Sequence, residues 1–356
     1  MSVIGARPNI IKMAAIHRKL SRKEKHTVVH TGQHYDYQMS EIFFKEFKLP
    51  KPSFNLEIGS GTASYQIGET MIRLEKVILE IVPGLVLVYG DTNSTLAGAL
   101  TARKCNIPIA HIESGLRSFD MRMPEETNRI LTDHIGNILF APTPTAVTNL
   151  EKENVRGRIV YTGDISVEIV HEALTAKSSI LQDLGLEFRS YILLTMHRAE
   201  NTELVSTLDS IVNLIGMLDP LTVVFPIHPR TKKIMQDSKL YSRLEKYRNL
   251  KLIPPVGYVD FINLVKNSKK VVTDSGGVQK EAYLLGTPCV TLRENTEWVE
   301  TVSEKRNILV GTETNAVMNA ITDWTPNDYE IKPVFGTGDA SDIILAGFQT
   351  GDFRFF

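Results

Sequence analysis

The sequence predicts an α/β protein made of two doubly wound domains, each built on a parallel sheet covered by helices. Short apolar runs alternate with longer amphipathic runs along all 356 residues. Such alternation is typical of parallel strands joined by crossover helices. The candidate strands number about twelve, which is more than one ordinary open sheet holds. We therefore expect two sheets, one in each half of the chain.

The candidate elements follow one another in a regular order. The strands of the first half are short, apolar and rich in β-branched residues, at 2–4, 27–30, 85–89, 107–112, 138–141 and 159–161. Those of the second half lie at 191–195, 221–226, 250–253, 270–273, 289–292 and 307–310. Helical periodicity fills most of the intervals, most clearly at 11–20, 68–81, 93–104, 124–135, 204–218, 261–266 and 278–285.

The boundary between the domains is expected at 164–170, just after Thr162-Gly163. The tail contains a helix-like run at 340–347, which we expect to return to the first domain. The predicted domains are therefore 1–165 with 340–356, and 166–339. The G-S-G run at 59–61 lacks the third glycine of a dinucleotide fingerprint and is interpreted as a loop.

Composition excludes several classes of protein. A net charge of −1 argues against a broad surface for nucleic acid or an anionic membrane. Cys105 and Cys289 are the two cysteines, and their separation supports neither a disulfide framework nor a metal pair. The apolar part of the N-terminus is too short for a signal peptide. No apolar run approaches the ~20 residues of a membrane span. We expect a cytoplasmic protein with no nucleic-acid or membrane partner.

The stretch 269–300 has the pattern of a nucleotide-binding βαβ unit. A strand ends just before Ser275, Gly276 and Gly277, and a helix follows them. The glycines let the backbone approach a ligand, and the helix N-terminus offers N–H groups to an anion. Glu281 lies one turn into the helix, where a carboxylate can accept hydrogen bonds from ribose hydroxyls. An ordinary βα turn with a Gly-Gly start remains the structural alternative.

Acidic residues gather where strands end. Asp91 and Glu113 each follow an apolar strand, and Glu125 and Glu126 follow Pro124 in a first helical turn. Structural alternatives exist, because Asp91 can cap a helix and the two glutamates can complement a helix dipole. Glu113 has no such simple role. Adjacent carboxylates shift each other's pKa so that one is protonated while another is ionised. The set therefore suits a reaction that needs both an acid and a base.

Four basic side chains, Arg7, Lys12, His197 and Arg198, also follow strands. Cations suit a diphosphate, because they stabilise the charge that builds on the bridging oxygen as it leaves. The alternatives are a solvated helix face for Lys12 and a core position for His197. Ligands of open parallel sheets bind at the carboxyl ends of strands, so we expect one cleft between the domains. Two histidines stay undecided between site and structure: His34 and His228.

An ordered set of motifs runs along nearly the whole chain: G-A-R-P (5–8), T-G-Q-H (31–34), G-D-T (90–92), H-I-E-S-G-L-R (111–117), P-E-E-T-N-R (124–129), T-M-H-R (195–198), D-S-G-G-V-Q-K-E-A (274–282), R-E-N-T-E (293–297) and G-T-G-D-A-S (336–341). With these motifs the chain resembles the non-hydrolysing UDP-N-acetylglucosamine 2-epimerases. The resemblance implies a GT-B fold, in which two Rossmann-like domains hold the substrate between them. It also implies a homodimer.

The resemblance implies a reversible interconversion of UDP-GlcNAc and UDP-ManNAc. UDP leaves by anti elimination to a 2-acetamidoglucal and then adds back with protonation of the opposite C2 face. Neither a nicotinamide nor an obligatory metal is implied.

Carried over by motif, the acid/base candidates are Asp91, Glu113 and Glu125. His197 is grouped with them and, like Arg7, matches a position that handles the diphosphate. The substrate-binding candidates carried over are Arg7, Lys12, Arg198, Ser275, Gly276, Gly277 and Glu281.

The sequence departs from the family pattern at a few places, including Asn9, where glutamate is usual, and Ala199, where arginine is usual. Asp164-Ile165 and Trp298-Val299 are further departures.

The sequence leaves several alternative functions open. One is a hydrolysing relative that releases ManNAc and UDP, since water access depends on loop closure. Another is a sister epimerase acting on a modified UDP-sugar such as a diacetamido uronate. A GT-B glycosyltransferase would share the nucleotide seat without needing the acidic trio. A UDP-sugar sensor would bind without turnover.

Overall fold

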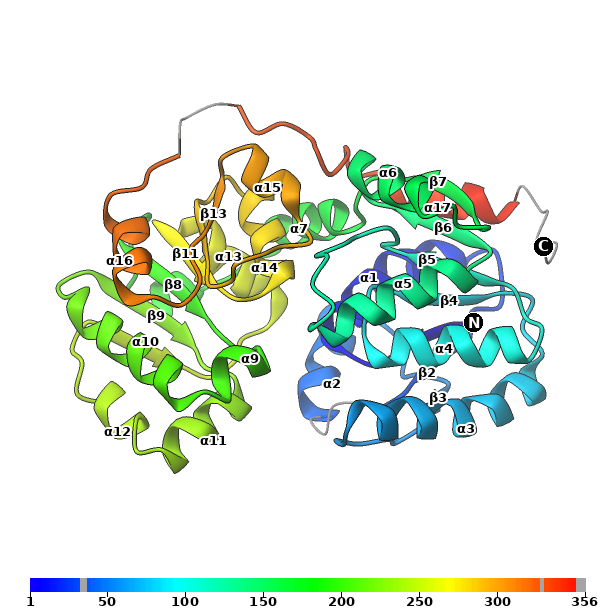
Figure 1. The fold of residues 1–356 in the computed structure, drawn as a ribbon, viewed down its shortest axis with the longest axis horizontal. Coiled ribbons are helices and arrows are strands. Elements are labelled where there is room, and N and C mark those ends of the chain that lie inside the picture. The colour runs from blue at the N-terminus through cyan, green and yellow to red at the C-terminus, as the bar shows by residue number, and fades with distance from the viewer. Residues whose placement is uncertain (33–36, 327–329, 350–356) are drawn as a thin grey trace. The chain divides into compact units, whose positions relative to one another are not determined.

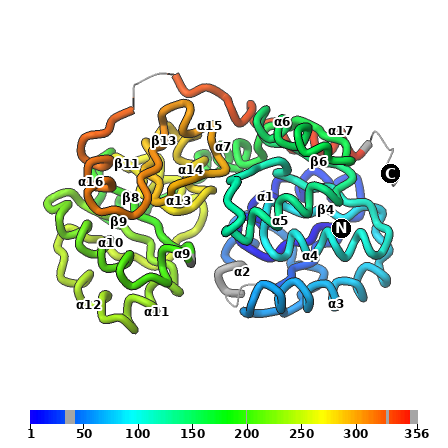
Figure 2. Tube along the Cα trace, viewed as in Figure 1, coloured from blue at the N-terminus to red at the C-terminus, as the bar shows by residue number. Residues whose placement is uncertain are grey.

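The computed structural model describes residues 1–32, 37–326 and 330–349, which form two compact units. Unit 1 consists of Met1–His171 with Pro333–Phe356, and unit 2 of Glu172–Lys332. Figures 1 and 2 trace the chain from blue to red, with the red C-terminal helix in the same unit as the blue N-terminal strands. No helix of the described residues is both long enough and apolar enough to cross a membrane.

Unit 1 is built on a seven-stranded parallel sheet in the order β3-β2-β1-β4-β5-β6-β7. Its strands are β1 (Ser2–Ile4), β2 (Val28–His30), β3 (Phe54–Asn55), β4 (Val86–Tyr89), β5 (Ile109–Ile112), β6 (Ile138–Ala141) and β7 (Arg158–Tyr161). The five strands from β2 to β6 in this order are buried along their full length. Such apolar strands are typical of a parallel sheet with both faces covered.

Helices cover both faces of the first sheet. They are α1 (Arg7–Leu20), α2 (Tyr37–Glu46), α3 (Ala63–Ile81), α4 (Asn93–Lys104), α5 (Pro124–Ile135), α6 (Pro144–Lys152), α7 (Ser166–Thr175) and α17 (Ala340–Gln349). Several begin at recognisable signals. The Thr62 hydroxyl accepts from the Tyr65 N–H at the start of α3, and proline opens both α5 and α6.

Unit 2 has a six-stranded parallel sheet in the order β10-β9-β8-β11-β12-β13. The strands are β8 (Tyr191–Thr195), β9 (Thr222–Pro226), β10 (Leu250–Ile253), β11 (Lys270–Thr273), β12 (Cys289–Thr291) and β13 (Asn307–Leu309). The helices are α8 (Ile180–Asp183), α9 (Ala199–Thr202), α10 (Val205–Met217), α11 (Pro229–Asp237), α12 (Tyr241–Leu244), α13 (Tyr258–Asn267), α14 (Gly276–Leu284), α15 (Val299–Ser303) and α16 (Thr314–Thr322).

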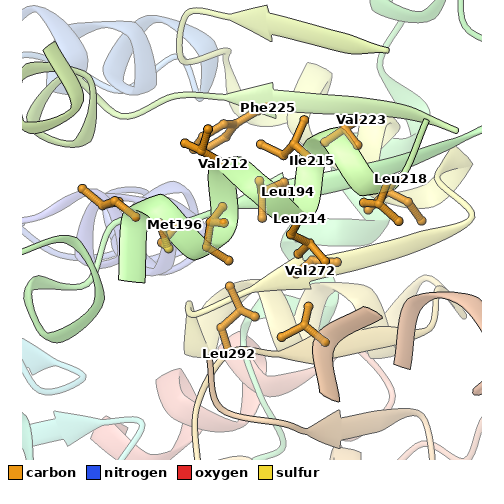
Figure 3. Close-up of a cluster of buried hydrophobic side chains, with 14 of the residues drawn as sticks. Leu194, Met196, Val212, Leu214, Ile215, Leu218, Val223, Phe225, Val272 and Leu292 are labelled. Atoms are coloured by element: carbon orange, nitrogen blue, oxygen red, sulfur yellow. The ribbon is translucent and has the colours of Figure 1, made fainter. Parts of the chain in front are cut away.

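The main core of unit 2 lies between its sheet and α10. Leu194 of β8 and Phe225 of β9 meet Val212 and Ile215 of α10 in this cluster, as Figure 3 shows. Their burial removes apolar surface from water, which is the dominant favourable term in folding. The expected α/β class with two parallel sheets is confirmed.

The tail and α7 together close unit 1. The backbone N–H and hydroxyl of Ser341 donate to Glu168 of α7, at 2.6 and 2.5 Å, and Lys19 of α1 pairs with Asp342 at 2.8 Å. Because α7 runs through the boundary, unit 1 extends to His171, a few residues beyond the expected 165. The tail joins unit 1 from Pro333 rather than from 340.

Candidate functional site

In unit 1 the turns after β1, β4 and β5 lie at one edge of the sheet, because these three strands are neighbours and run parallel. This is the edge at which open parallel sheets bind ligands. The turns carry Arg7, Asp91 and Glu113, three of the predicted site residues.

Glu113 follows β5 in a conformation that is rare for a residue with a side chain. Its φ is +70°, and its N–H and that of Ser114 both donate to the Phe140 carbonyl at 3.1 Å. Its carboxylate contacts the Lys12 ammonium at 2.5 Å, and both side chains are largely buried. Lys12 is therefore not on a solvated helix face. Left-handed backbone in non-glycine residues persists only where the surroundings fix it, and such positions cluster at functional sites.

Asp91 follows Gly90 at the end of β4 and is held by Arg129 of α5. The Asp91 Oδ2 accepts from Arg129 Nη2 at 2.6 Å and from Nε at 3.0 Å. Asp91 is not the cap of α4, because the Thr92 hydroxyl fills that role by accepting from the Thr95 N–H. The capping alternative for Asp91 is therefore wrong, and its carboxylate is partly exposed beside a guanidinium.

Glu126 has a structural role. Its carboxylate is buried and accepts from the N–H groups of Ser118 and Phe119, the Ser118 hydroxyl and Arg129. It closes the loop between β5 and α5 and completes the surroundings of Arg129. Glu125 lies next to it in the first turn of α5 and is partly exposed. Of the two adjacent glutamates, only Glu125 is therefore exposed to a ligand from solvent.

Asn9 links the turns after β1 and β4. Its Oδ1 accepts from the Ala6 N–H at 3.1 Å and from the Thr92 hydroxyl at 3.3 Å, while its Nδ2 donates to the Tyr89 carbonyl at 2.7 Å. A carboxylate here would lose the bond to Tyr89, so the amide suits this chain. Arg7, two residues earlier, lies over the Phe43 ring at 5.0 Å.

In unit 2 the neighbouring strands β8 and β11 place His197 and Arg198 beside Asp274. The buried Asp274 accepts from the N–H groups of both residues at 3.0–3.2 Å, and its Oδ1 lies 3.2 Å from His197 Nδ1. Burial works to raise the pKa of Asp274, but the hydrogen bonds and charge of His197, with the Arg198 N–H and Asn201, hold it below its usual value. The His197 ring stays half exposed, so it is not a core histidine.

The N-terminus of α14 is exposed at Gly277. The helix starts at Gly276, and the N–H groups of a first helical turn lack carbonyl partners in their own helix. A Cβ at Gly277 would have only the Ser275 Oγ near it, at 3.9 Å. A Cβ at Gly276 would lie 1.9 Å from Glu297 Oε1, so any other residue there would displace the Glu297 carboxylate. Glu281 lies in α14, half-buried.

Arg293 and Arg198 lie near Glu297. Arg293 Nη2 contacts Glu297 Oε2 at 2.9 Å, and Arg198 Nη2 lies 3.9 Å from its Oε1. Glu297 thus brings a carboxylate to the same helix N-terminus that would take a phosphate. His228 caps α11 by accepting from the Arg230 N–H, and its ring centroid is 6.4 Å from that of His197.

Sequence reasoning gave no role to three residues that fix these groups: Arg129, Asp274 and Glu297. Each lies inside a quoted motif, but the candidate site residue that it contacts, Asp91, His197 or Arg198, is distant in sequence, so spacing alone does not reveal that contact. His34 lies outside the described residues. Among those that are described, no three His, Cys, Asp or Glu side chains group as a metal site would require.

The chain is similar to known proteins in sequence and in structure. The family model described as UDP-N-acetylglucosamine 2-epimerase matches residues 18–348. A Methanococcus maripaludis protein named UDP-N-acetylglucosamine 2-epimerase homolog is 48% identical over 349 residues, 97% of this chain and 98% of its own. The UDP-2,3-diacetamido-2,3-dideoxy-D-glucuronate 2-epimerase of Pseudomonas aeruginosa is 44% identical over 353 residues, 97% of each chain.

A similar solved structure is the crystal structure of Methanocaldococcus jannaschii UDP-GlcNAc 2-epimerase in complex with UDP-GlcNAc and UDP. Its TM-score is 0.92 at 42% identity, and the match covers 98% of this chain and 99% of that one.

Proposed function

We propose that this chain, which belongs to the UDP-N-acetylglucosamine 2-epimerase family, inverts C2 of UDP-GlcNAc without hydrolysing it. The observation that carries the proposal is the pair of carboxylates at one sheet edge of unit 1, each held by its own cation. A protein that only bound a UDP-sugar would have no need for two fixed carboxylates at its ligand-binding edge.

The carboxylates would move the C2 proton. A base takes the proton from C2, the C2–H electron pair forms the C1–C2 double bond, and the C1–O bond breaks with its electrons leaving on UDP. Addition of UDP in the reverse sense, with a proton delivered to the other face of C2, gives the epimer. We assign the proton transfers to Asp91, Glu113 and Glu125. Lys12 and Arg129 support this because they fix two of these side chains.

Unit 2 would hold UDP. The N-terminus of α14, with Ser275, Gly276 and the exposed Gly277, suits a phosphate. His197 and Arg198, fixed by Asp274, are the cationic and donor groups that would stabilise charge on the departing diphosphate. Arg7 and Lys12 belong to the same proposal, although Lys12 already contacts Glu113. Glu281 is assigned to the ribose hydroxyls.

A modified UDP-sugar is the second candidate substrate. The Pseudomonas aeruginosa relative, at 44% identity, carries the name of an epimerase of UDP-2,3-diacetamido-2,3-dideoxy-D-glucuronate. The two substrates differ at C3, which is next to C2, and at C6, and neither position has a bond made or broken in the reaction. The same carboxylates would serve either one, so only competition between substrates separates them.

Product analysis tests the proposal. The protein is incubated with UDP-GlcNAc, and in parallel with the diacetamido uronate, and the products are followed by ¹H and ³¹P NMR. We expect UDP-ManNAc to accumulate to equilibrium with only traces of free UDP. Free ManNAc with stoichiometric UDP would establish the hydrolysing reaction instead. A kcat/KM at least tenfold higher for the uronate would show that the uronate is the substrate. Binding of both compounds without turnover would show that the protein is a UDP-sugar sensor.

We also propose a homodimer, formed through α3. Tyr65, Ile72 and Leu79 recur every seven residues on this helix and are 47–66% exposed. This spacing places them on one face, as in a helix that packs against another helix. Charges of both signs flank them, at Glu69, Arg73, Glu75 and Lys76. An identical helix related by a two-fold axis would therefore meet both apolar and opposite-charge partners.

A further inference from the structure

A buried cluster of charges lies beneath the sheet edge that carries Asp91 and Glu113. Its centre is His111, in β5, whose side chain is fully buried. His111 Nδ1 lies 2.7 Å from Asp133 Oδ1, and Asp133 belongs to α5. His111 Nε2 lies 2.7 Å from the Gly90 carbonyl, at the end of β4. Neither atom has a role in the proton transfers proposed above.

The geometry fixes the charge of the ring. A carbonyl oxygen only accepts, so Nε2 must carry a hydrogen, and an ionised carboxylate also only accepts, so Nδ1 must carry one too. Asp133 Oδ2 accepts the Gly115 N–H at 3.0 Å and lies 2.8 Å from Arg117 Nη1, the surroundings of an ionised carboxylate. Burial works to raise the pKa of Asp133, but the charges and hydrogen bonds of His111 and Arg117 keep it below its usual value. An imidazole that donates from both nitrogens is an imidazolium.

The remaining charges of the cluster balance. Arg117 Nη1 lies 2.8 Å from Asp133 Oδ2, and its Nε and Nη2 donate to Glu153 at 2.8 Å each. His134 Nε2 lies 3.4 Å from Glu153 on the more exposed side. Two cations, His111 and Arg117, therefore meet two carboxylates, Asp133 and Glu153. Buried ion pairs are tolerated when they are compensated and hydrogen-bonded in this way.

The cluster is hydrogen-bonded to the backbone of both turns that carry the acid/base candidates Asp91 and Glu113. His111 donates to the carbonyl of Gly90, the residue directly before Asp91. The backbone of Gly90 has a φ of +63°. Asp133 Oδ2 accepts the N–H of Gly115, two residues after Glu113, at 3.0 Å. The two turns that present the acid/base candidates are thus fixed to one His–Asp pair.

We propose that the His111 ring donates from both nitrogens in the folded protein and is a positioning residue, which through Asp133 fixes the Gly90–Asp91 and Glu113–Gly115 turns in one relative geometry. The inference rests on the proposed function only where it concerns turnover. Misplacing a catalytic group by about 1 Å costs on the order of 10²-fold in rate. Loss of the His111 bonds should therefore lower kcat more than it raises KM.

The first test needs no substrate. In the full chain labelled with ¹⁵N-histidine, NMR at pH 7.5 should show His111 with both ring nitrogens protonated. A neutral tautomer at that pH would overturn the proposal. In His111→Gln, which keeps one donor, amide exchange should become at least about tenfold faster in 90–92 and 113–116, with unit 2 unchanged. Unchanged exchange in these turns would also overturn it.

The second test uses turnover. We expect kcat to fall about 10-fold to 10²-fold in His111→Gln and further in His111→Leu, with the affinity for UDP unchanged. Thr101→Val is the matched control, because it removes a buried hydrogen bond within α4, to the Ala97 carbonyl, and both residues lie outside the two turns. Wild-type kcat in His111→Leu would contradict the positioning role. Failure of the wild type to turn over UDP-GlcNAc would count against the function alone, because the NMR and exchange results are independent of it.

Discussion

Each of two acid/base candidates is fixed by a cation from another element: Lys12 for Glu113 and Arg129 for Asp91. A carboxylate that is hydrogen-bonded to a cation keeps a defined position and can still accept a proton. The expectation of neighbouring carboxylates that shift each other's pKa stays a prediction. The described contacts instead place a positive charge beside each one.

Asp91→Asn and Glu113→Gln should each keep UDP affinity, because neither replaces a residue that is proposed to bind UDP. Each should lose C2 exchange by about 10²-fold or more, which is the usual contribution of an acid/base group. Isothermal calorimetry with UDP and NMR of the C2 proton measure the two effects. Glu80→Gln, on the exposed face of α3, is the control. Near-normal exchange in both site variants would remove the assignment.

Asp274 should make stability dependent on pH. Its pKa is lower in the folded protein than in the unfolded chain, so its stabilisation is complete above about pH 4 and is lost as the pH falls through the folded value. Asp274→Asn should lower stability by about 1–3 kcal/mol at pH 7. The difference in melting temperature between wild type and variant should shrink from pH 7 to pH 3. A difference that stays constant or grows would contradict this account.

The residue types of the site were predictable, whereas their partners were not. Strand ends followed by D, E or G-G identify Asp91, Glu113 and Ser275–Gly277 from local pattern alone. Lys12–Glu113 and Arg129–Asp91 join residues 101 and 38 positions apart, so only the fold brings them together. Asp133 carries no signal at all, because a buried aspartate in α5 looks like any polar residue of an amphipathic helix.

Among the elements, long periodic helices and most apolar strands were predicted well, and the shortest strand was missed. The helices at 93–104 and 124–135 have the predicted ends, because Thr92 caps one and Pro124 opens the other. The helix predicted from 68 begins at Ala63, because Gly68 is tolerated inside it and Thr62 supplies the cap. The strand β3 was not predicted, since its two residues, Phe54 and Asn55, have no periodicity.

The exposed apolar face of α3 leads to a prediction at this scale. Ile72→Glu should weaken self-association by about 2 kcal/mol or more, because it would bury a charge at the centre of the proposed contact. Light scattering after gel filtration, at several concentrations, measures the change. Met217→Glu, at an equally exposed apolar position on α10, should leave the mass unchanged. A monomeric wild type, or an Ile72→Glu dimer as tight as the wild type, would contradict the prediction.

At the scale of the whole molecule, unit 1 is formed by two separate segments of the chain and unit 2 by a single one. The alternation of strands and helices predicts two sheets, but it does not say that the tail completes the first unit. The hydrogen bonds of Ser341 with Glu168 and the burial of Ile344 and Leu345 account for it. These contacts join segments more than 170 residues apart, which local periodicity does not record.

Deletion of 340–356 should therefore destabilise unit 1 selectively. The deletion exposes surface that α17 covers, including α1, and each large apolar side chain lost contributes about 1.5–3 kcal/mol. Differential scanning calorimetry should show a lower-melting transition for unit 1 and an unchanged one for unit 2. Asp342→Asn, which removes only a partly exposed ion pair, should shift neither by more than a degree or two. An unchanged thermogram for the deletion would contradict the role of the tail.

The central claim is that the carboxylates of unit 1 exchange the proton at C2 of a UDP-sugar. Incubation with UDP-GlcNAc in D₂O, followed by ¹H NMR of the sugar, tests it most directly. We predict deuterium at C2 in both UDP-GlcNAc and UDP-ManNAc, with no exchange in Asp91→Asn or Glu113→Gln on the same timescale. UDP-ManNAc that retains the original C2 proton would contradict the account.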